Sequence, residues 1–459
     1  MKRRVKEGEA ISHYQAYQPM DIAIGDANSG PILHRLPPTT ATRVANQKGT
    51  HQWISFFRSV FLFLFLYFFF FDPDFSFIKW ISSAYLLYFF AFLYFLLHSK
   101  ELIKIASRFQ RELLVLLSIF VYSIFRTIIG GEAGYVFVHF RMLLDIFVLP
   151  ICFVYLCHSW KITSKCAIRW FLVVGSVAAI LSCLCFLIPS FNIYVRYTLL
   201  AFEEDSYLLT NLNRGFGIAS TLTSAYASAL SVITCFGLVY SANNKWFFLM
   251  VPFMIVAMMV CARTSFVLLI FGVFVYLLAH GNRGSLFIVA ALVLLLYIII
   301  CIAIEKETEM GVTIAWALDF FNQFFSVFET GSVEGTTAER LLAEDLVWPN
   351  GLFNWIFGIG KNILHNDTSQ IRSDIGFTRQ LFYGGIIYLY LLIQLVVTIC
   401  KRSRNRVFRG FVFLFLVAFI IFNFKGQFLP DTAGFRVFVL LYFITRYGNL
   451  KKVVSNAYR

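Results

Sequence analysis

Apolar runs of about 20 residues recur along most of this 459-residue chain. A helix of that length crosses a hydrocarbon core of about 30 Å. The composition agrees, because 59% of the residues are apolar and only 14% are charged, whereas a soluble domain has about 25% charged residues. The sequence therefore predicts an all-α, polytopic integral membrane protein.

The apolar runs predict about twelve transmembrane helices. They lie near 54–71, 80–97, 113–129, 134–157, 168–189, 215–240, 246–261, 264–279, 285–304, 381–400, 410–424 and 435–447. The two runs that flank Arg263 and the final run are short, so each of these could instead be a broken or tilted hairpin.

The predicted spans divide the chain into five parts. Residues 1–50 are polar, contain Pro37-Pro38 and lack the apolar core of a signal peptide, so we expect a disordered tail without a cleavable signal. The parts that follow are nine spans in 51–304, a large loop in 305–380, three spans in 381–447 and a second tail in 448–459.

The short loops between spans predict the orientation, because cytoplasmic loops carry an excess of Lys and Arg. Basic residues concentrate in 98–112, 158–167, 241–245, 280–284 and 401–409. Both termini are then cytoplasmic, and the large loop lies on the outer face of the membrane. This pattern also accounts for the net charge of +14, so nucleic acid is not an expected partner.

The large loop contains two helical patterns of its own. Aromatic residues recur every four positions from Trp316 to Phe328, with polar residues between them, which predicts an amphipathic helix in the membrane interface. Thr336 and Glu339 form a capping box that predicts a second helix ending before Pro349. A loop of this length with its own helices is typical of a functional lid.

Cationic residues also occur on the predicted outer side, where the topology rule disfavours them. They are Arg126, His139, Arg141, Arg196, Arg214, Arg263, Arg340, Arg372, Arg379, Lys425 and Arg436. Guanidinium groups bind phosphate oxygens bidentately, so the set suggests a cationic chamber for an anionic lipid-linked ligand. Alternatively, each arginine extends to lipid headgroups or pairs with a nearby acid, as Arg141 would with Asp145 one turn away.

Three stretches in this order resemble the O-antigen polymerase and ligase superfamily. They are CARTSF at 261–266, RLLAEDLVWPNG at 340–351 with FGIG following at 357–360, and SDIGFTRQLFYGGII at 373–387. The similarity is greatest to Wzy-type polysaccharide polymerases, in which an arginine and a glycine separated by ten residues lie in an outer loop. Arg340 and Gly351 have this spacing.

The third stretch separates the two branches of the superfamily. Ligases have His-Asn at its start, whereas this chain has Ser373-Asp374, and its His365-Asn366 pair lies too far upstream. The resemblance thus implies a metal-independent polymerase that joins undecaprenyl-pyrophosphate-linked oligosaccharide repeat units by an inverting glycosyl transfer. It also implies a flippase, a chain-length regulator and membrane lipids as partners.

The resemblance implies roles for individual residues. Arg263 and Arg340 would stabilise the pyrophosphate leaving group, and Asp374 would accept the proton of the attacking hydroxyl. The substrate-binding candidates are Arg126, Arg141, Arg196, Arg214, Arg372, Arg379 and Gly351. Two structural alternatives remain, because Arg340 could pair with Glu344 and Asp374 could cap a helix. Glu339 and Asp345 are weaker candidates for the base.

The chain has neither a P-loop nor a C-x-x-C pair, so no cofactor and no metal are expected. Two other functions remain open. A ligase would transfer the finished polymer to lipid A core. A flippase or other transporter would have short loops and a polar site at the membrane midplane, whereas here the cations cluster at the outer face under a long loop.

Overall fold

The computed structural model describes residues 38–78, 82–201, 217–220, 223–240, 245–262, 264–280, 319, 323, 329, 332, 336–361, 363, 373–402, 406–430 and 432–457. The chain divides into two units, Met1–Phe57 and Arg58–Arg459. The helical bundle and the candidate site belong to the second unit.

The described residues confirm an all-α protein. The helices are α1 (Pro38–Phe71), α2 (Ser83–Ala106), α3 (Gln110–Ile128), α4 (Gly134–Leu143), α5 (Leu149–Ser159), α6 (Ser164–Leu187), α7 (Pro189–Tyr194), α9 (Thr223–Tyr240), α10 (Lys245–Cys261), α11 (Thr264–His280), α14 (Thr337–Arg340), α15 (Leu352–Phe357), α16 (Gly376–Arg402), α17 (Arg406–Phe424) and α18 (Ala433–Ala457). In the described ranges, extended pairing is limited to one isolated bridge between Phe75 and Leu200.

Four helices are long and apolar enough to cross a membrane. They are Trp53–Phe71, Gly134–Ser159, Ser164–Leu187 and Gly376–Lys401, and each overlaps a predicted span. Four shorter apolar helices, Ser224–Leu238, Phe247–Cys261, Val267–Leu278 and Gly410–Phe424, lie within other predicted spans. The assignment to a membrane is supported, whereas the total of about twelve spans stays a prediction. The predicted spans 80–97, 113–129 and 435–447 coincide with α2, α3 and α18, which are not among these apolar helices, and 285–304 lies outside the described residues.

The helices extend beyond the predicted boundaries at both ends of the chain. α1 begins at Pro38, inside the segment 1–50 that the composition predicts to be disordered. Proline suits the first helical position because its missing N–H has no intrahelical partner there. α18 continues to Ala457 through most of the predicted tail 448–459. Extending an existing helix requires no new nucleus, so polar residues can follow an apolar span in helical form.

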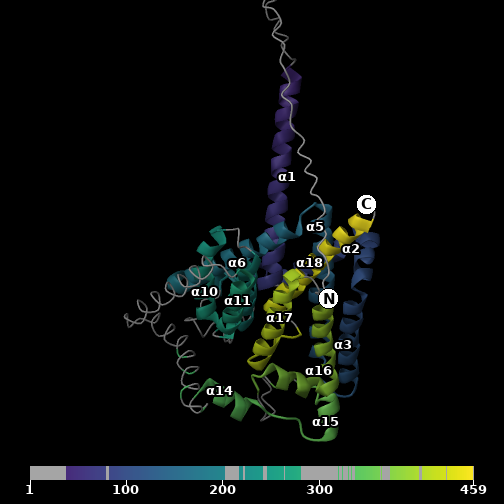
Figure 1. The fold of residues 1–459 in the computed structure, drawn as a ribbon, viewed down its shortest axis with the longest axis vertical. Helices are drawn as coiled ribbons and strands as arrows, with labels where there is room; N and C mark the ends of the chain where they lie inside the picture. The colour runs from purple at the N-terminus through teal and green to yellow at the C-terminus, as the bar shows by residue number, and fades with distance from the viewer. Residues whose placement is uncertain are drawn as a thin grey trace, which may run out of the picture. The chain divides into compact units, whose positions relative to one another are not determined.

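The basic segment 98–112, predicted to be a loop, is helical, because α2 continues past its kink at His98 to Ala106 and α3 begins at Gln110. It shares one end of the helical bundle with 158–167 and with the part of α18 around Arg446. Arg446 forms an ion pair with Glu112 at the start of α3, and the Arg108 guanidinium lies over the Tyr447 ring. At the other end, Tyr122 near the end of α3 donates a hydrogen bond to the Gly384 carbonyl of α16 at 2.7 Å. Figure 1 shows α15 and the start of α16 opposite the C-terminus of α18.

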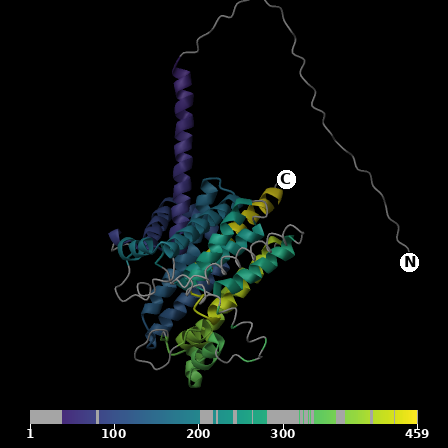
Figure 2. The same ribbon diagram turned by 90° about the vertical axis from the view of Figure 1, so that its left-hand side faces the viewer.

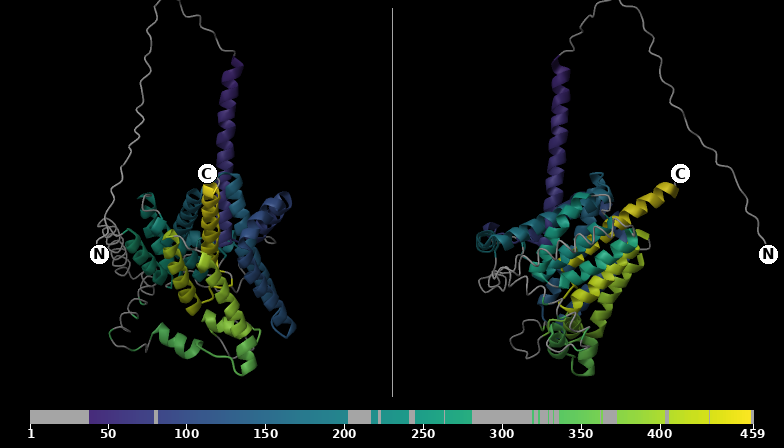
Figure 3. Two further views of the ribbon diagram at one scale, coloured as in Figure 1. Left: turned by 45° about the vertical axis from the view of Figure 1, so that its right-hand side comes forward. Right: turned by 60° about the vertical axis from the view of Figure 1, so that its left-hand side comes forward.

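Small residues let α9 pack closely against α6, α10, α11 and α18. The Gly434 N–H of α18 donates to Ser228 Oγ at 3.2 Å, and a Cβ atom at Gly434 would lie 2.6 Å from that oxygen. Small residues at helix interfaces are typical of membrane bundles, because they allow close backbone approach. The teal helices α9 to α11 lie beside the yellow α17 and α18 in both Figure 2 and Figure 3.

Candidate functional site

The second helix predicted in the large loop is present. Thr336 Oγ1 accepts a hydrogen bond from the Glu339 N–H at 3.3 Å, which is the N-cap contact that the capping box predicts. α14 begins at Thr337 and continues into a π-helical turn that ends at Asp345, before Pro349. The capped turn carries Arg340 and Asp345 on one rigid element.

Arg340 pairs with an acid far along the chain. Its Nη2 lies 3.3 Å from Oδ2 of Asp374, just before α16. The Arg340 side chain is 58% exposed, so the contact anchors one side of the guanidinium and leaves much of the group accessible. The observed ion pair thus joins the second and third stretches that carry the family resemblance.

Asp345 forms the second contact between the loop and α16. Its Oδ1 accepts from the Asp374 N–H at 3.2 Å, and its carbonyl oxygen accepts from Ser373 Oγ at 2.5 Å. The carboxylate is buried, and its Oδ2 has no hydrogen-bond partner among the described residues. Burial raises the pKa of Asp345 above its ordinary value, and the neighbouring charge of Asp374 adds to the effect.

The raised pKa of Asp345 predicts a stability that depends on pH. The protein binds this proton more tightly when folded, so the stabilisation is present at low pH and is lost as the pH rises through the folded-state pKa. We expect Asp345→Asn to raise the midpoint of thermal unfolding at neutral pH. The gain should vanish below the unfolded-state pKa of about 3.9, where the wild-type carboxyl is protonated in both states. The measurement is thermal unfolding in detergent. An equal rise of the unfolding midpoint at neutral pH and below the unfolded-state pKa would contradict this explanation.

The FGIG turn packs on a break in α16. The N–H groups of Ile359 and Gly360 donate to the carbonyl oxygens of Phe382 and Tyr383 at 2.6 and 3.0 Å. α16 is kinked at Gly385, where φ is +65°. Gly358 also has a positive φ of +76°, and a Cβ atom there would collide with the Tyr383 carbonyl oxygen. Glycine is therefore required at Gly358 both by φ and by space.

Gly358→Ala should destabilise the protein by at least about 1–2 kcal/mol, which is the usual penalty of a left-handed conformation for a residue with a Cβ atom. The steric contact with Tyr383 adds to that penalty. Gly134→Ala is the matched control, because Gly134 starts α4 and a Cβ there would meet no described atom within 4 Å. The control should be neutral or stabilising by up to about 1 kcal/mol. Equal unfolding free energies for the two variants would refute the requirement.

Arg126 holds the same turn from α3. Its Nη2 donates to the Gly358 carbonyl at 3.2 Å, and a Cβ atom at Gly360 would lie 2.6 Å from this nitrogen. The side chain is buried, and its Nε has no hydrogen-bond partner in the described ranges. These contacts give Arg126 a positioning role beneath the turn.

Two stacked tyrosines, Tyr135 and Tyr383, form an aromatic wall near Arg126 and Arg379. The rings of Tyr135 on α4 and Tyr383 on α16 stack with centroids 3.8 Å apart. Arg126 lies near Tyr383, and Arg379 lies near Tyr135 and Asp374. The Tyr383 hydroxyl is buried and has no hydrogen-bond partner within the described part of the chain.

We refer to these residues together as the loop–helix site. It comprises Arg126, Tyr135, Arg340, Asp345, Asp374, Arg379 and Tyr383. Three guanidinium groups from α3, α14 and α16 thus lie at one end of the bundle with two aspartates. Such an arrangement can bind an anion and accept a proton.

Arg141 and Arg436 belong to a different cluster, around Asp145. Arg141 pairs with Asp72 and, at 3.4 Å, with Asp145, which is the local pairing that the sequence offered as the alternative to ligand binding. Arg436 Nη2 lies 3.1 Å from Asp145 Oδ2, and Tyr88 donates to Oδ1 of the same carboxylate at 2.8 Å. Two arginines and two aspartates balance one another in this cluster.

Arg196 and Gly351 have no contact with the loop–helix site in the described part of the chain. Arg196 is buried near Cys185 and Cys261, and burial lowers its pKa to about 10. Gly351 precedes α15 with a φ of +83°, and a Cβ atom there would meet no described atom within 4 Å, so its backbone conformation alone favours glycine. Arg214, Arg263 and Arg372 lie outside the described residues.

The amphipathic helix predicted from Trp316 to Phe328 falls mostly outside the described residues. Its described members Asp319 and Gln323 are helical, and Gln323 Nε2 donates to Asp319 Oδ2 at 2.5 Å. This contact between residues one turn apart agrees with the prediction at these two positions. His365, the ligase-like alternative, is also outside the described residues.

Sequence reasoning missed the aromatic wall and the partner Asp72. Tyr135 and His139 are one turn apart on the same predicted span, and His139 Nε2 lies 2.7 Å from the Tyr388 hydroxyl. That spacing of two polar aromatic residues was the available signal. Asp72 directly follows an apolar run, which placed it at a span boundary but could not identify Arg141 as its partner.

Among the described residues, no group of three or more His, Cys, Asp or Glu side chains could hold a metal ion. No protein-family model matches the chain, and no curated protein matches it.

Proposed function

We propose that this protein is a polysaccharide polymerase, which joins undecaprenyl-pyrophosphate-linked repeat units at the outer face of a bacterial inner membrane. The proposal includes the finer topology, with about twelve spans, both termini in the cytoplasm and the loop 305–380 in the periplasm. A flippase that supplies repeat units and a protein that regulates chain length are the proposed partners.

The ion pair between Arg340 and Asp374 is the observation that carries the proposal. It joins an accessible guanidinium to a carboxylate at the start of α16, a helix apolar enough to span a membrane. A lipid-linked pyrophosphate carries its charges at the surface of the bilayer, whereas its glycan extends into water. A cation and a proton acceptor at that depth are what transfer from such a donor requires.

The reaction is a single displacement. A hydroxyl oxygen of the acceptor repeat unit attacks the anomeric carbon of the donor glycan, and a new glycosidic C–O bond forms with inversion. The bond from the anomeric carbon to the pyrophosphate oxygen breaks, and its electron pair leaves with the lipid pyrophosphate. The hydroxyl proton passes to a carboxylate, for which Asp374 is the first candidate and Asp345 the second.

The arginines have different parts in this proposal. Arg340 contacts the pyrophosphate, because its side chain is exposed while its position is held by Asp374. Arg379 adds positive charge beside Asp374, and Arg126 supports the FGIG turn from below. Arg263, Arg372 and Arg214 remain proposed contacts whose geometry lies outside the described residues.

The glycan profile of a deletion strain tests the proposal. A strain that lacks the protein should display single repeat units on its surface lipid, and purified wild-type protein should lengthen a lipid-linked repeat unit without added lipid A core. A deletion strain with no repeat units at all would indicate a ligase or a flippase. Growth of long chains in that strain would refute the polymerase.

A further inference from the structure

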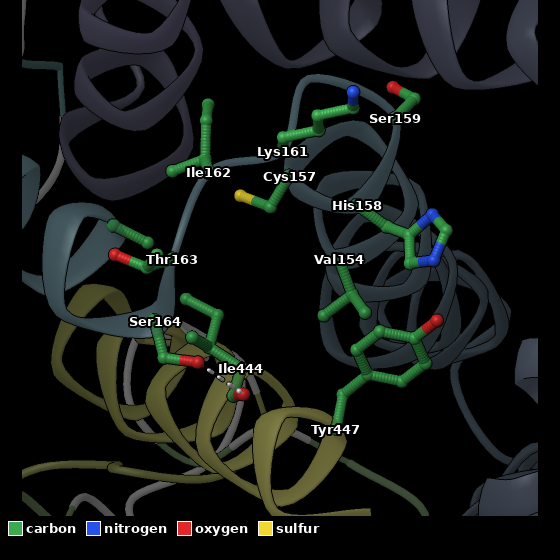
Figure 4. A pocket seen from close by; sticks show the side chains of 11 residues that line it. Val154, Cys157, His158, Ser159, Lys161, Ile162, Thr163, Ser164, Ile444 and Tyr447 are labelled. Carbon is green, nitrogen blue, oxygen red and sulfur yellow. Dashed lines mark hydrogen bonds between the residues drawn. The ribbon is translucent and has the colours of Figure 1, made fainter. Parts of the chain in front are cut away.

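A cavity of about 630 Å³ lies at the opposite end of the bundle from the loop–helix site. The residues that line it come from the end of α5, the turn into α6 and the middle of α18, and include Lys161, Thr163 and Tyr447. Figure 4 shows these side chains arranged around one open space. Cavities of this size commonly hold small ligands.

The position of the cavity relates it to a membrane surface. The two helices that meet there, Gly134–Ser159 and Ser164–Leu187, are both long and apolar enough to span a bilayer. The cavity is at the turn where the first ends and the second begins. The ends of spanning helices lie at the level of the lipid headgroups.

The lining of the cavity is amphiphilic. Lys161, Ser159, Thr163 and Ser164 contribute an ammonium group and three hydroxyl groups. The apolar part of the lining comprises Val154, Ile162, Ala167 and Ile444. Ser164 Oγ donates to the Ile444 carbonyl at 3.5 Å, which ties α6 to α18 across the cavity (Figure 4). A ligand that fits this lining has a charged head and an apolar body.

Lys161 is held in an uncommon conformation at the rim. Its φ is +58°, which few residues other than glycine and asparagine adopt. The turn is closed by the Lys161 N–H, which donates to the His158 carbonyl at 3.2 Å, and by the Ile162 N–H, which donates to the Cys157 carbonyl at 2.8 Å. These bonds keep the ammonium-bearing residue next to the first turn of α6, where the N-terminal dipole also favours an anion.

We propose that this cavity binds the phosphate headgroup of an anionic phospholipid. The phosphate is held by the Lys161 ammonium group at the rim, and an acyl chain lies along Val154, Ile162 and Ile444. Basic pockets between membrane helices at the headgroup level bind anionic lipids in this way. The cavity is separate from the loop–helix site, so its binding of lipid can be tested independently of the proposed polymerase activity.

Native mass spectrometry of the full chain, purified in detergent with added phosphatidylglycerol, tests the proposal. Lys161→Asn is the test variant, because asparagine accepts a positive φ while the charge is lost. We expect the affinity for the lipid to fall about fivefold, as for the loss of one basic residue at a membrane surface. Lys161→Arg should retain binding.

Lys165→Asn is the matched control, because Lys165 lies four residues further along, on the first turn of α6, and does not line the cavity. Its lipid binding should equal that of the wild type. Equal losses in the two Asn variants, or no loss in Lys161→Asn, would overturn the proposal.

Two further probes identify the ligand. Excess inorganic phosphate should displace little of the bound phosphatidylglycerol, because it lacks the apolar body, and phosphatidylcholine should bind more weakly, because it has no net charge. Complete displacement by inorganic phosphate would show a site for free phosphate. Equal retention of phosphatidylcholine would show a site without charge selection. Either result would contradict the proposed anionic lipid.

Discussion

Arg340→Ala is expected to abolish polymerisation and to leave single repeat units on the cell surface. The loss of a positioned donor that stabilises a developing negative charge lowers turnover by about 100- to 1000-fold. Arg340→Lys should restore only part of the activity, because an ammonium group cannot bind a phosphate bidentately. The measurement is the length distribution of glycan in a deletion strain that carries each variant.

The control for this prediction is Arg169→Ala, which removes an exposed guanidinium from α6. It should preserve the wild-type distribution, since Arg169 is not part of the loop–helix site. Asp374→Asn removes both the ion pair with Arg340 and the first candidate for the base, so it should also leave single repeat units on the cell surface. If Arg340→Ala is present at normal protein levels and gives the wild-type distribution of glycan lengths, Arg340 does not have the proposed role in binding the pyrophosphate.

Asp145→Ala is expected to destabilise the protein by about 3–5 kcal/mol, because it removes the carboxylate from a buried ion pair with Arg436. Both side chains are almost fully buried, at 2% and 5% exposure. The exposed part of Arg141 can still pair with Asp72, but Arg436 would keep a charge in an apolar surrounding. Titration with sodium dodecyl sulfate in detergent micelles would measure the change in unfolding free energy.

The double variant Asp145→Leu with Arg436→Met is the control for that result. It removes both buried charges, so its stability should equal that of the wild type or exceed it by about 1–4 kcal/mol. A double variant that is as unstable as Asp145→Ala would show that lost packing, and not an uncompensated charge, causes the effect.

The local features of this protein were predictable from its sequence. Apolar runs predicted the four long apolar helices, because the length and composition that a membrane-crossing helix needs are visible in a single window of the sequence. The capping box at Thr336 and Glu339 placed α14 for a similar reason, since the atoms involved are three residues apart. Extension of α1 into 38–50 was missed, because a polar composition does not by itself exclude a helix.

The candidate site was predictable only in part. The outer arginines were identified by their conflict with the topology rule, but the rule contains no information on their partners. Arg340 could have paired with Glu344 and in fact contacts Asp374, whereas Arg141 pairs with Asp145 as the local alternative predicted and also with Asp72. Among the described outer arginines, Arg126, Arg340 and Arg379 thus belong to the loop–helix site, Arg141 and Arg436 belong to the charge-balanced cluster around Asp145, and Arg196 belongs to neither.

The helical class, the positions of the long apolar helices and the cap of α14 followed from the amino-acid order, because each depends on residues within a few turns of one another. Only the tertiary structure shows that Asp374 forms an ion pair with Arg340, that Gly358 lies against the kink of α16 and that Tyr135 stacks on Tyr383. These contacts join residues tens to hundreds of positions apart, and they depend on how whole helices pack. Local periodicity does not encode that packing, which is why the chemistry of the site became visible only in the folded chain.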